Sequence, residues 1–245
     1  MTEYLPLWAI VFFGGLVQGL TGFGFVLVAL PLVALFLDIR TVIPLVTALA
    51  FSICVILAWD LRRHLLLKRL SFLLLGTVPG ILTGVWLLKT MPASFLELLV
   101  ALCLLFFVGN TVLLKPRQRA WGWAGTCAAG FFSGMLGGSI GAGGPPVVVY
   151  SAAQPWPKDE IKSTMTSYFV LSGLGILVTQ YAGGLYTPGV LRLLLVSSPA
   201  LLLGVALGRK LYTRISGEGY HRLLMALLFL LGLLMLWRAV GAWMS

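Results

Sequence analysis

Charged residues are scarce in this sequence. Only 10% of its 245 residues are Asp, Glu, Lys or Arg, and just seven residues are acids, whereas soluble domains carry about 25% charged residues. Hydrophobic residues make up 60% of the chain, and the mean hydropathy is +1.03. A soluble fold of this length could not bury so much apolar surface. The composition therefore excludes an ordinary soluble domain and predicts a membrane protein.

Cysteine and histidine are also rare. The three cysteines, Cys54, Cys103 and Cys127, each lie in an apolar stretch and share no metal-ligand spacing with His64 or His221. We interpret them as buried thiols. No Ser/His/Asp set, HExxH pair or paired carboxylates can be assembled from so few polar residues. The sequence thus argues against an enzyme and predicts no metal and no cofactor.

Long apolar stretches with few ionisable residues fill most of the chain. In the first half they cover residues 5–37, 41–59, 72–88 and 95–114. Runs near or above about 18 apolar residues are typical of membrane-spanning helices. Because no polar linker interrupts them, we expect one all-α polytopic transmembrane domain over residues 1–245. The N-terminus lacks a basic region and a cleavage site, so the first segment is expected to be retained.

An internal repeat relates the two halves. The sequence GLVQGLTGFGFVLVALP, residues 15–31, aligns without gaps with GFFSGMLGGSIGAGGPP, residues 130–146, at an offset of 115 (130 − 15). Farther on, the residues around Pro79 align with those around Pro199 at an offset of 120 (199 − 79). The repeats therefore cover about 5–114 and about 120–240, each with one long apolar segment followed by three ordinary ones.

Basic residues gather in short connections between apolar segments. Such a distribution is unlike the single basic face of a nucleic-acid-binding protein, and it indicates the cytoplasmic side of a membrane. There are three groups: Arg62, Arg63, Lys68 and Arg69; Lys115, Arg117 and Arg119; and Arg209, Lys210, Arg214 and Arg222. Eight simple crossings would put the third group on the opposite side from the first two.

The conflict disappears if the long segments, residues 5–37 and 120–153, are helical hairpins that enter and leave the membrane by one face. Each is too long for a single span of about 20 residues. We therefore predict two inverted four-segment repeats, a layout common in secondary transporters, each beginning with a hairpin broken at a glycine-rich tip. This layout puts Lys158 and Lys162 in the cytoplasm and Thr187 outside.

Each predicted hairpin has its glycine-rich tip near the bilayer midplane. Non-helical backbone is tolerated there only if it is buried in protein or lines a wet cavity. The returning arm also presents a helix N-terminus, which suits a small oxyanion. We expect the substrate to be held between the tips by ten residues: Gln18, Thr21, Gly22, Phe23, Gly24, Gly138, Ser139, Gly141, Gly143 and Gly144.

Other glycines are better explained by helix packing. Pairs four residues apart commonly allow two helices to approach closely, and we assign this role to Gly15 and Gly19, Gly130 and Gly134, and Gly80 and Gly84. The segment TGFG at residues 21–24 is similar to a potassium-channel filter. That filter needs four equivalent copies and the chain supplies two unequal ones, so a cation channel is disfavoured.

The two glycine-rich segments, GLVQGLTGFGFVLVALPLV and GFFSGMLGGSIGAGGPPVVVYS, together resemble the sulfite exporter TauE/SafE family of membrane transporters. The resemblance extends over the whole chain, and the family motifs correspond to Gly19–Gly24 and Gly134–Pro146. It implies a multi-pass permease of the cell inner membrane whose substrates are sulfite and organosulfonates.

The expected function is therefore secondary transport, as an exporter, of a small anion such as sulfite or an organosulfonate, in contact with membrane lipid. No acid is evident at the midplane, which weakens a carboxylate-coupled mechanism. Proton or ion coupling and homo-oligomerisation stay open. So do two alternatives: an anion channel or facilitator of the same topology, and a structural or assembly subunit without transport activity.

Overall fold

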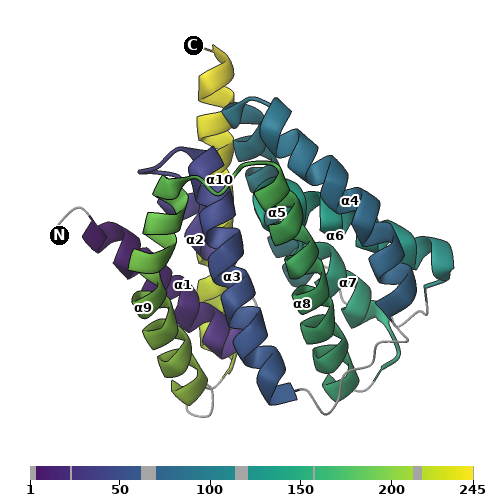
Figure 1. Ribbon diagram of the computed structural model, residues 1–245. Helices are drawn as coiled ribbons and strands as arrows, with labels where there is room; N and C mark the ends of the chain where they lie inside the picture. Colours follow the sequence, from purple (N-terminus) through teal and green to yellow (C-terminus); the bar gives the residue numbers. More distant parts are fainter. Residues whose placement is uncertain are drawn as a thin grey trace. The chain divides into compact units, whose positions relative to one another are not determined.

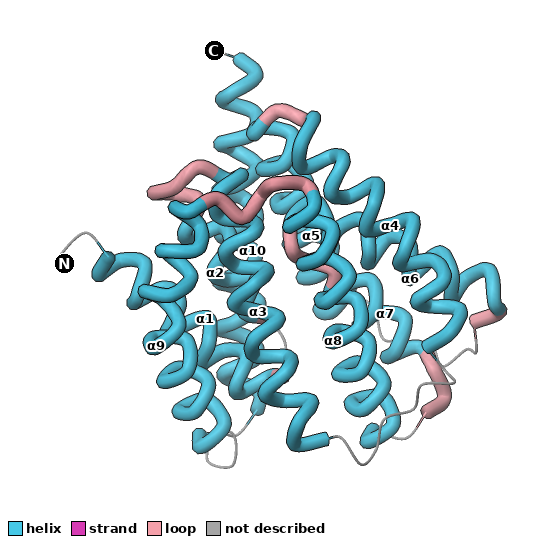
Figure 2. Tube along the Cα trace, viewed as in Figure 1, coloured by secondary structure: helices cyan, strands magenta, loops and turns pink. Residues whose placement is uncertain are grey.

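The computed structural model describes residues 4–22, 24–61, 70–113, 121–156, 158–211 and 217–244. In these residues the chain forms ten helices with short connections and no strand, which confirms the predicted all-α class (Figures 1 and 2). The helices are α1 Leu5–Thr21, α2 Phe25–Val33, α3 Ile39–Leu61, α4 Ser71–Thr90, α5 Ala93–Leu113, α6 Trp123–Ile140, α7 Gly144–Ala153, α8 Lys158–Ala182, α9 Pro188–Leu211 and α10 Gly217–Met244.

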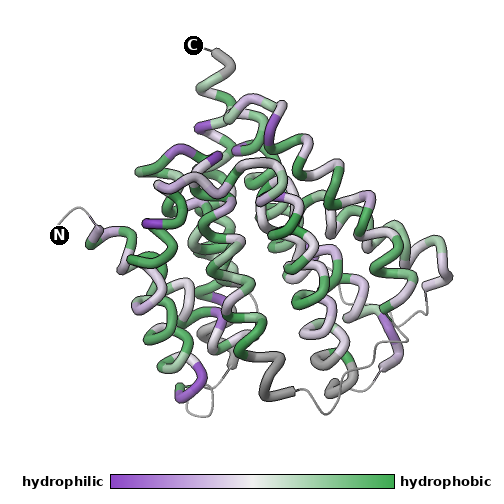
Figure 3. Tube along the Cα trace, in the orientation of Figure 1, coloured by the Kyte–Doolittle hydropathy of each residue, from purple (hydrophilic) through white to green (hydrophobic). Residues whose placement is uncertain are grey.

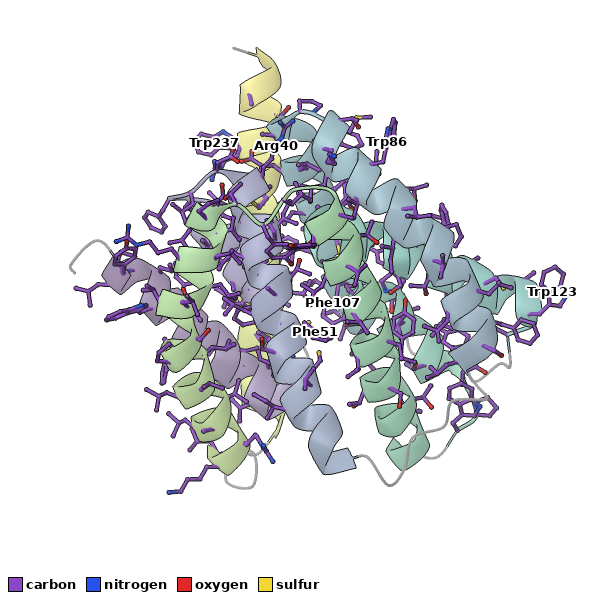
Figure 4. All side chains as sticks on the ribbon, in the orientation of Figure 1. Arg40, Phe51, Trp86, Phe107, Trp123 and Trp237 are labelled. Atoms are coloured by element: carbon purple, nitrogen blue, oxygen red, sulfur yellow. The ribbon has the colours of Figure 1, made fainter. Side chains whose placement is uncertain are left out.

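Five of the described helices are long and apolar enough to cross a membrane: α3, α4, α5, α9 and α10. Hydrophobic residues run along most of their length (Figure 3). Large apolar side chains also face outward, as expected of a surface in contact with lipid. Trp123 and Trp237 are 71% and 75% exposed, and both project away from the ribbon, as does Trp86 (Figure 4).

The helices form two compact units that do not coincide with the sequence halves. Unit 1 contains Met1–Ile53, Pro92–Val108 and Tyr186–Ser245, and unit 2 contains Cys54–Met91 and Gly109–Leu185. Helices α3 and α5 each pass from one unit to the other. As a result, each unit combines helices from both repeats.

In unit 2, α4 and α6 pack closely through glycines. A Cβ on Gly76 would overlap Cys127, and one on Gly80 would overlap Phe131. One on Gly84 would overlap Met135. The residue numbers of the contacting pairs increase together in both helices, so α4 and α6 are parallel and lie side by side (Figure 1).

Glycines of α6 approach α4 in the same way. A Cβ on Gly130 or Gly134 would overlap the backbone of α4. Because contacts this close leave no room for a side chain, the packing role predicted for Gly80, Gly84, Gly130 and Gly134 is confirmed.

In unit 1, α1 and α9 form the corresponding pair. A Cβ on Gly15 would lie 2.9 Å from the Leu201 carbonyl oxygen, and one on Gly19 would lie 2.6 Å from that of Val205. Gly204 and Gly208 of α9 approach α1 equally closely. Here too the residue numbers of the contacting pairs increase together in both helices, so α1 and α9 are parallel. The predicted packing role of Gly15 and Gly19 is likewise confirmed.

An ion pair connects three helices of unit 1. Arg238 on α10 lies 3.0 Å from the carboxylate of Glu97 on α5, measured between Nη2 and Oε1. Its Nη1 donates a hydrogen bond of 2.6 Å to the carbonyl of Ala34, at the C-terminal end of α2. The Glu97 side chain is only 9% exposed, so Arg238 neutralises a largely buried charge.

Candidate functional site

The first hairpin breaks where the sequence predicts. Helix α1 ends at Thr21, and both Gly22 (φ 80°) and Gly24 (φ 106°) adopt left-handed conformations that favour glycine. Helix α2 then folds back along α1. The close contact at Gly14 shows this, since a Cβ on Gly14 would lie 3.0 Å from Phe25 and 3.4 Å from Ala29. We call residues 22–24 the first tip. Its arms are unequal, with 17 residues in α1 and nine in α2.

The second hairpin has the same form in unit 2. Helix α6 ends at Ile140, and the next residue, Gly141, is in the left-handed conformation (φ 69°); its N–H donates to the carbonyl of Gly137 at 3.0 Å. Helix α7 starts at Gly144 and returns along α6, because a Cβ on Gly143 would lie 2.7 Å from the carbonyl oxygen of Ser133. We call residues 141–144 the second tip.

The side chain of Gln18 closes the first tip. Its Oε1 accepts a hydrogen bond of 3.1 Å from the Phe25 N–H, and the residue is only 4% exposed. The first helical hydrogen bond of α2 joins the Val28 N–H to the Gly24 carbonyl at 3.2 Å. The N–H groups of Val26 and Leu27 therefore precede this bond at the positive end of the helix.

The other predicted residues of the first tip differ in their surroundings. The Thr21 hydroxyl donates to the carbonyl of Val17 at 2.9 Å, on its own helix. Gly22 is exposed, and a Cβ there would meet nothing within 4 Å. Phe23 lies outside the described residues. Gln18, Thr21, Gly22 and Gly24 are thus gathered at the turn between α1 and α2.

The predicted residues of the second tip separate into two groups. Gly141, Gly143 and Gly144 form the turn itself. Gly138 and Ser139 lie instead on the face of α6 that packs on α4: a Cβ on Gly138 would lie 2.7 Å from the Ile81 carbonyl oxygen. Ser139 is fully buried, and its hydroxyl donates to the carbonyl of Met135 at 2.7 Å.

Two prolines limit the hydrogen-bond donors of the second tip. Pro145 and Pro146 occupy the first turn of α7 and have no N–H, so the donors there are the backbone groups of Gly143 and Gly144. Gly144 has room around it, since the nearest atom to a Cβ there would be Cζ of Phe169 at 4.0 Å. A methyl group would therefore fit at this position.

A buried hydroxyl network supports the second tip. The Ser133 hydroxyl donates to the carbonyl of Gly143, the N-cap residue of α7. The Tyr168 hydroxyl on α8 interacts with Ser133 and lies 2.8 Å from Oγ1 of Thr77 on α4. Sequence reasoning did not identify Tyr168, because a tyrosine within an apolar helix carries no signal of the partners that it meets.

Two of the described acids take part in contacts away from the tips, whereas Arg209 of α9 comes close to the first tip: a Cβ on Gly19 would lie 3.0 Å from the Arg209 backbone nitrogen. Asp38 immediately precedes α3, and its Oδ2 accepts a hydrogen bond of 2.9 Å from the Arg40 N–H; Glu97 pairs with Arg238. Among the described residues, no group of three or more His, Cys, Asp or Glu side chains could hold a metal ion. The donors within the turns themselves are neutral backbone groups at the starts of α2 and α7.

A family model for the sulfite exporter TauE/SafE matches residues 7–235, including both hairpins. The chain belongs to this family. Membership confirms the resemblance noted in the glycine-rich segments, and it makes the protein a multi-pass membrane transporter rather than an enzyme. The family implies a small anion such as sulfite as the substrate class.

One relative matches the TauE/SafE chain along nearly all of its length. A protein of Cupriavidus necator described as a probable sulfite/organosulfonate exporter TauE is 26% identical over 249 residues, which cover 98% of this chain and 96% of that protein. No solved structure matches the chain.

Proposed function

We propose that this chain is a secondary transporter that exports sulfite or an organosulfonate across the cell inner membrane. The observation that carries the proposal is the pair of broken hairpins, in which left-handed glycines bring a helix N-terminus back into the interior of each unit. The description of the Cupriavidus necator relative as a probable exporter of these anions supports the substrate class and the direction.

The chemistry of the tips fits such a substrate. Sulfite and sulfonates present a compact negative group of three oxygens, which backbone N–H groups at a helix N-terminus can bind. At the first tip the donors are those of Val26 and Leu27, and at the second tip those of Gly143 and Gly144. Neutral donors bind an anion less tightly than arginine would, which favours release on the far side.

The helix order supports inverted repeats. Each hairpin folds back, and three long helices follow it: α3 to α5 in the first half and α8 to α10 in the second. An odd number of crossings starts the second half from the opposite face of the membrane. The parallel pairs α1 with α9 and α4 with α6 fit this order, because each joins the first helix of one repeat to the fourth helix of the other.

Flux measurements in proteoliposomes test the proposal. We expect saturable uptake of [³⁵S]sulfite, with competition from organosulfonates and little from carboxylates. Counterflow of labelled sulfite against unlabelled sulfite is expected of a carrier, whereas flux that does not saturate would indicate a channel. Repeating the assay with and without a proton gradient tests coupling. Absence of flux for every anion in the panel would refute a transport function for sulfite and sulfonates.

A further inference from the structure

Two buried hydroxyls of unit 2 depart from the pattern of the others. Most buried serines and threonines on the described helices donate to the carbonyl four residues earlier, as Thr77 does to Leu73 and Ser172 does to Tyr168, each at 2.7 Å. Such back-bonding satisfies a hydroxyl in an apolar environment. Ser151 and Thr164 are 0% and 1% exposed, yet their hydroxyls have no protein partner.

A third polar group of unit 2 shares this property. Nε2 of Gln154, in a residue that is 4% exposed, also has no hydrogen-bond partner in the protein. Gln154 is the residue that ends α7, and its backbone N–H donates to the carbonyl of Ser151 at 3.2 Å. These two residues therefore lie together at the end of α7 that is remote from the second tip.

Ser151 and Thr164 lie on the faces through which α7 and α8 pack. Val147 of α7 and Tyr168 of α8 belong to one buried apolar cluster, and the two helices lie side by side (Figure 1). Ser151 follows Val147 by four residues, and Thr164 precedes Tyr168 by four. Residues four apart share a helix face, so each hydroxyl lies on the face of its helix that takes part in the α7–α8 contact.

An unsatisfied polar group in a protein interior costs about 1–3 kcal/mol. Three such groups at one junction would lower the stability of the fold if they had only a structural role, because alanine or valine would pack there without that cost. A bound water or ion is a common partner for buried polar groups of this kind. Gln154 Nε2 is purely a donor, and each hydroxyl can donate, so an occupant rich in acceptor oxygens satisfies all three.

We propose that unit 2 holds a second anion-binding site, formed by Ser151, Thr164 and Gln154 at the junction of α7 and α8. The choice of an oxyanion as its ligand rests on the proposed transport function. Ser151 lies seven residues beyond Gly144, about 10 Å along α7 from the second tip. The site is therefore distinct from the tip and serves as a binding step between the tip and the loop that joins α7 to α8.

Two aromatic rings lie beside the proposed site. The Tyr150 and Trp156 rings pack edge to face at the same end of α7, with centroids 6.0 Å apart. The three polar groups without a protein partner are neutral, like the backbone donors of the second tip.

Counting the sulfite bound per chain tests the proposal. The purified full-length protein in detergent is titrated with [³⁵S]sulfite under anaerobic conditions, and its melting temperature is measured with and without the anion. We expect two anions per wild-type chain and one per chain for the double variant Ser151→Ala/Thr164→Val. The matched control is Thr47→Val/Ser197→Ala, whose hydroxyls are buried but back-bonded, and it should still bind two anions.

Thermal stability separates a ligand role from a structural one. Without sulfite, Ser151→Ala/Thr164→Val should melt at the wild-type temperature or above, because it removes unsatisfied buried groups. Its stabilisation by sulfite should be smaller than that of the wild type. A single anion per wild-type chain, or unchanged binding in the variant, would overturn the inference and indicate that water occupies the junction.

The two proposals fail in different ways. Two-site binding without sulfite flux in proteoliposomes counts against the transport function alone. Sulfite flux together with only one bound anion per wild-type chain counts against the second site alone. A wild-type chain that binds no sulfite has no second site for it, and the flux assay then decides the transport function separately.

Discussion

Gln18 reaches across the first tip and holds its two arms together. Its amide oxygen receives the N–H of Phe25, seven residues later, in a position where a bound anion could also accept a hydrogen bond. This contact makes Gln18 a cap for α2, in addition to the substrate contact that the sequence predicts. The two roles respond differently to substitution.

Replacing Gln18 with glutamate separates these roles. Gln18→Glu keeps an acceptor for the Phe25 N–H and places a negative charge at a helix N-terminus, so the melting temperature should stay within a few degrees of wild type. Two like charges about 4 Å apart repel by about 4 kcal/mol at an effective dielectric constant of 20. Sulfite flux should therefore fall at least tenfold.

Gln18→Leu removes the cap and should lower the melting temperature. Wild-type flux in Gln18→Glu would mean that the anion does not approach this tip.

The glycines of the tips should be intolerant of side chains. Gly24→Leu puts a branched side chain at φ 106°, and Gly143→Leu forces a Cβ to within 2.7 Å of the Ser133 carbonyl oxygen. We expect both to abolish sulfite flux while the protein is still detected in the membrane fraction. Gly109→Leu is the control, since a Cβ there meets nothing within 4 Å. Full activity in both tip variants would refute the placement of the substrate site.

At the scale of helices, the sequence predicted the breaks better than the packing partners. Gly22 and Gly141 could be recognised because clustered glycines disfavour a continuous helix wherever it lies. The spacing of Gly80 and Gly84 likewise indicated a close contact. It did not indicate that α6 makes that contact, because a repeat shows which helices are alike and not which ones meet.

The α4–α6 contact should be sensitive to a single methyl group. Gly84→Ala would push a Cβ to 2.9 Å from the Ser139 backbone nitrogen and closer still to Met135, so the helices must separate. We expect a loss of about 1–3 kcal/mol, as for an overpacked core, seen as a lower melting temperature in detergent. Gly109→Ala, in an open position of α5, should be neutral or slightly stabilising, because alanine favours a helix. Equal melting temperatures for the two variants would contradict the close packing.

The ion pair of unit 1 gives a second prediction at this scale. Arg238→Met leaves the Glu97 carboxylate largely buried without its partner, and breaking a buried pair costs about 3–5 kcal/mol. The Arg238 side chain is 34% exposed, so solvent screening should reduce the loss to about 3 kcal/mol or less. The double variant Glu97→Leu/Arg238→Met should recover part of the melting temperature. A double variant less stable than Arg238→Met would show that the unpaired charge is not the cause.

The two units of the whole molecule exchange helices between the repeats. Helix α1 of the first repeat packs with α9 of the second, and α6 of the second repeat packs with α4 of the first. Sequence reasoning divided the chain at about residue 115, where the repeat restarts. It could not foresee the exchange, because the similar glycine spacing of α1 and α6 does not say which helix each one contacts.

Two engineered cysteines test the inverted order of the membrane segments. Cys54, Cys103 and Cys127 are first replaced by alanine, so that a single new thiol reports its own side. The predicted inverted repeats, with three crossings after each hairpin, put Thr187→Cys outside and Lys158→Cys in the cytoplasm. Thr187 is exposed, and its hydroxyl accepts the Val190 N–H at 3.3 Å, so losing this cap should cost about 1 kcal/mol and leave the fold intact.

In intact cells an impermeant maleimide should label position 187 directly and position 158 only after permeabilisation. Labelling of position 158 from outside would require an even number of crossings between the hairpins, and the two halves would then be parallel copies.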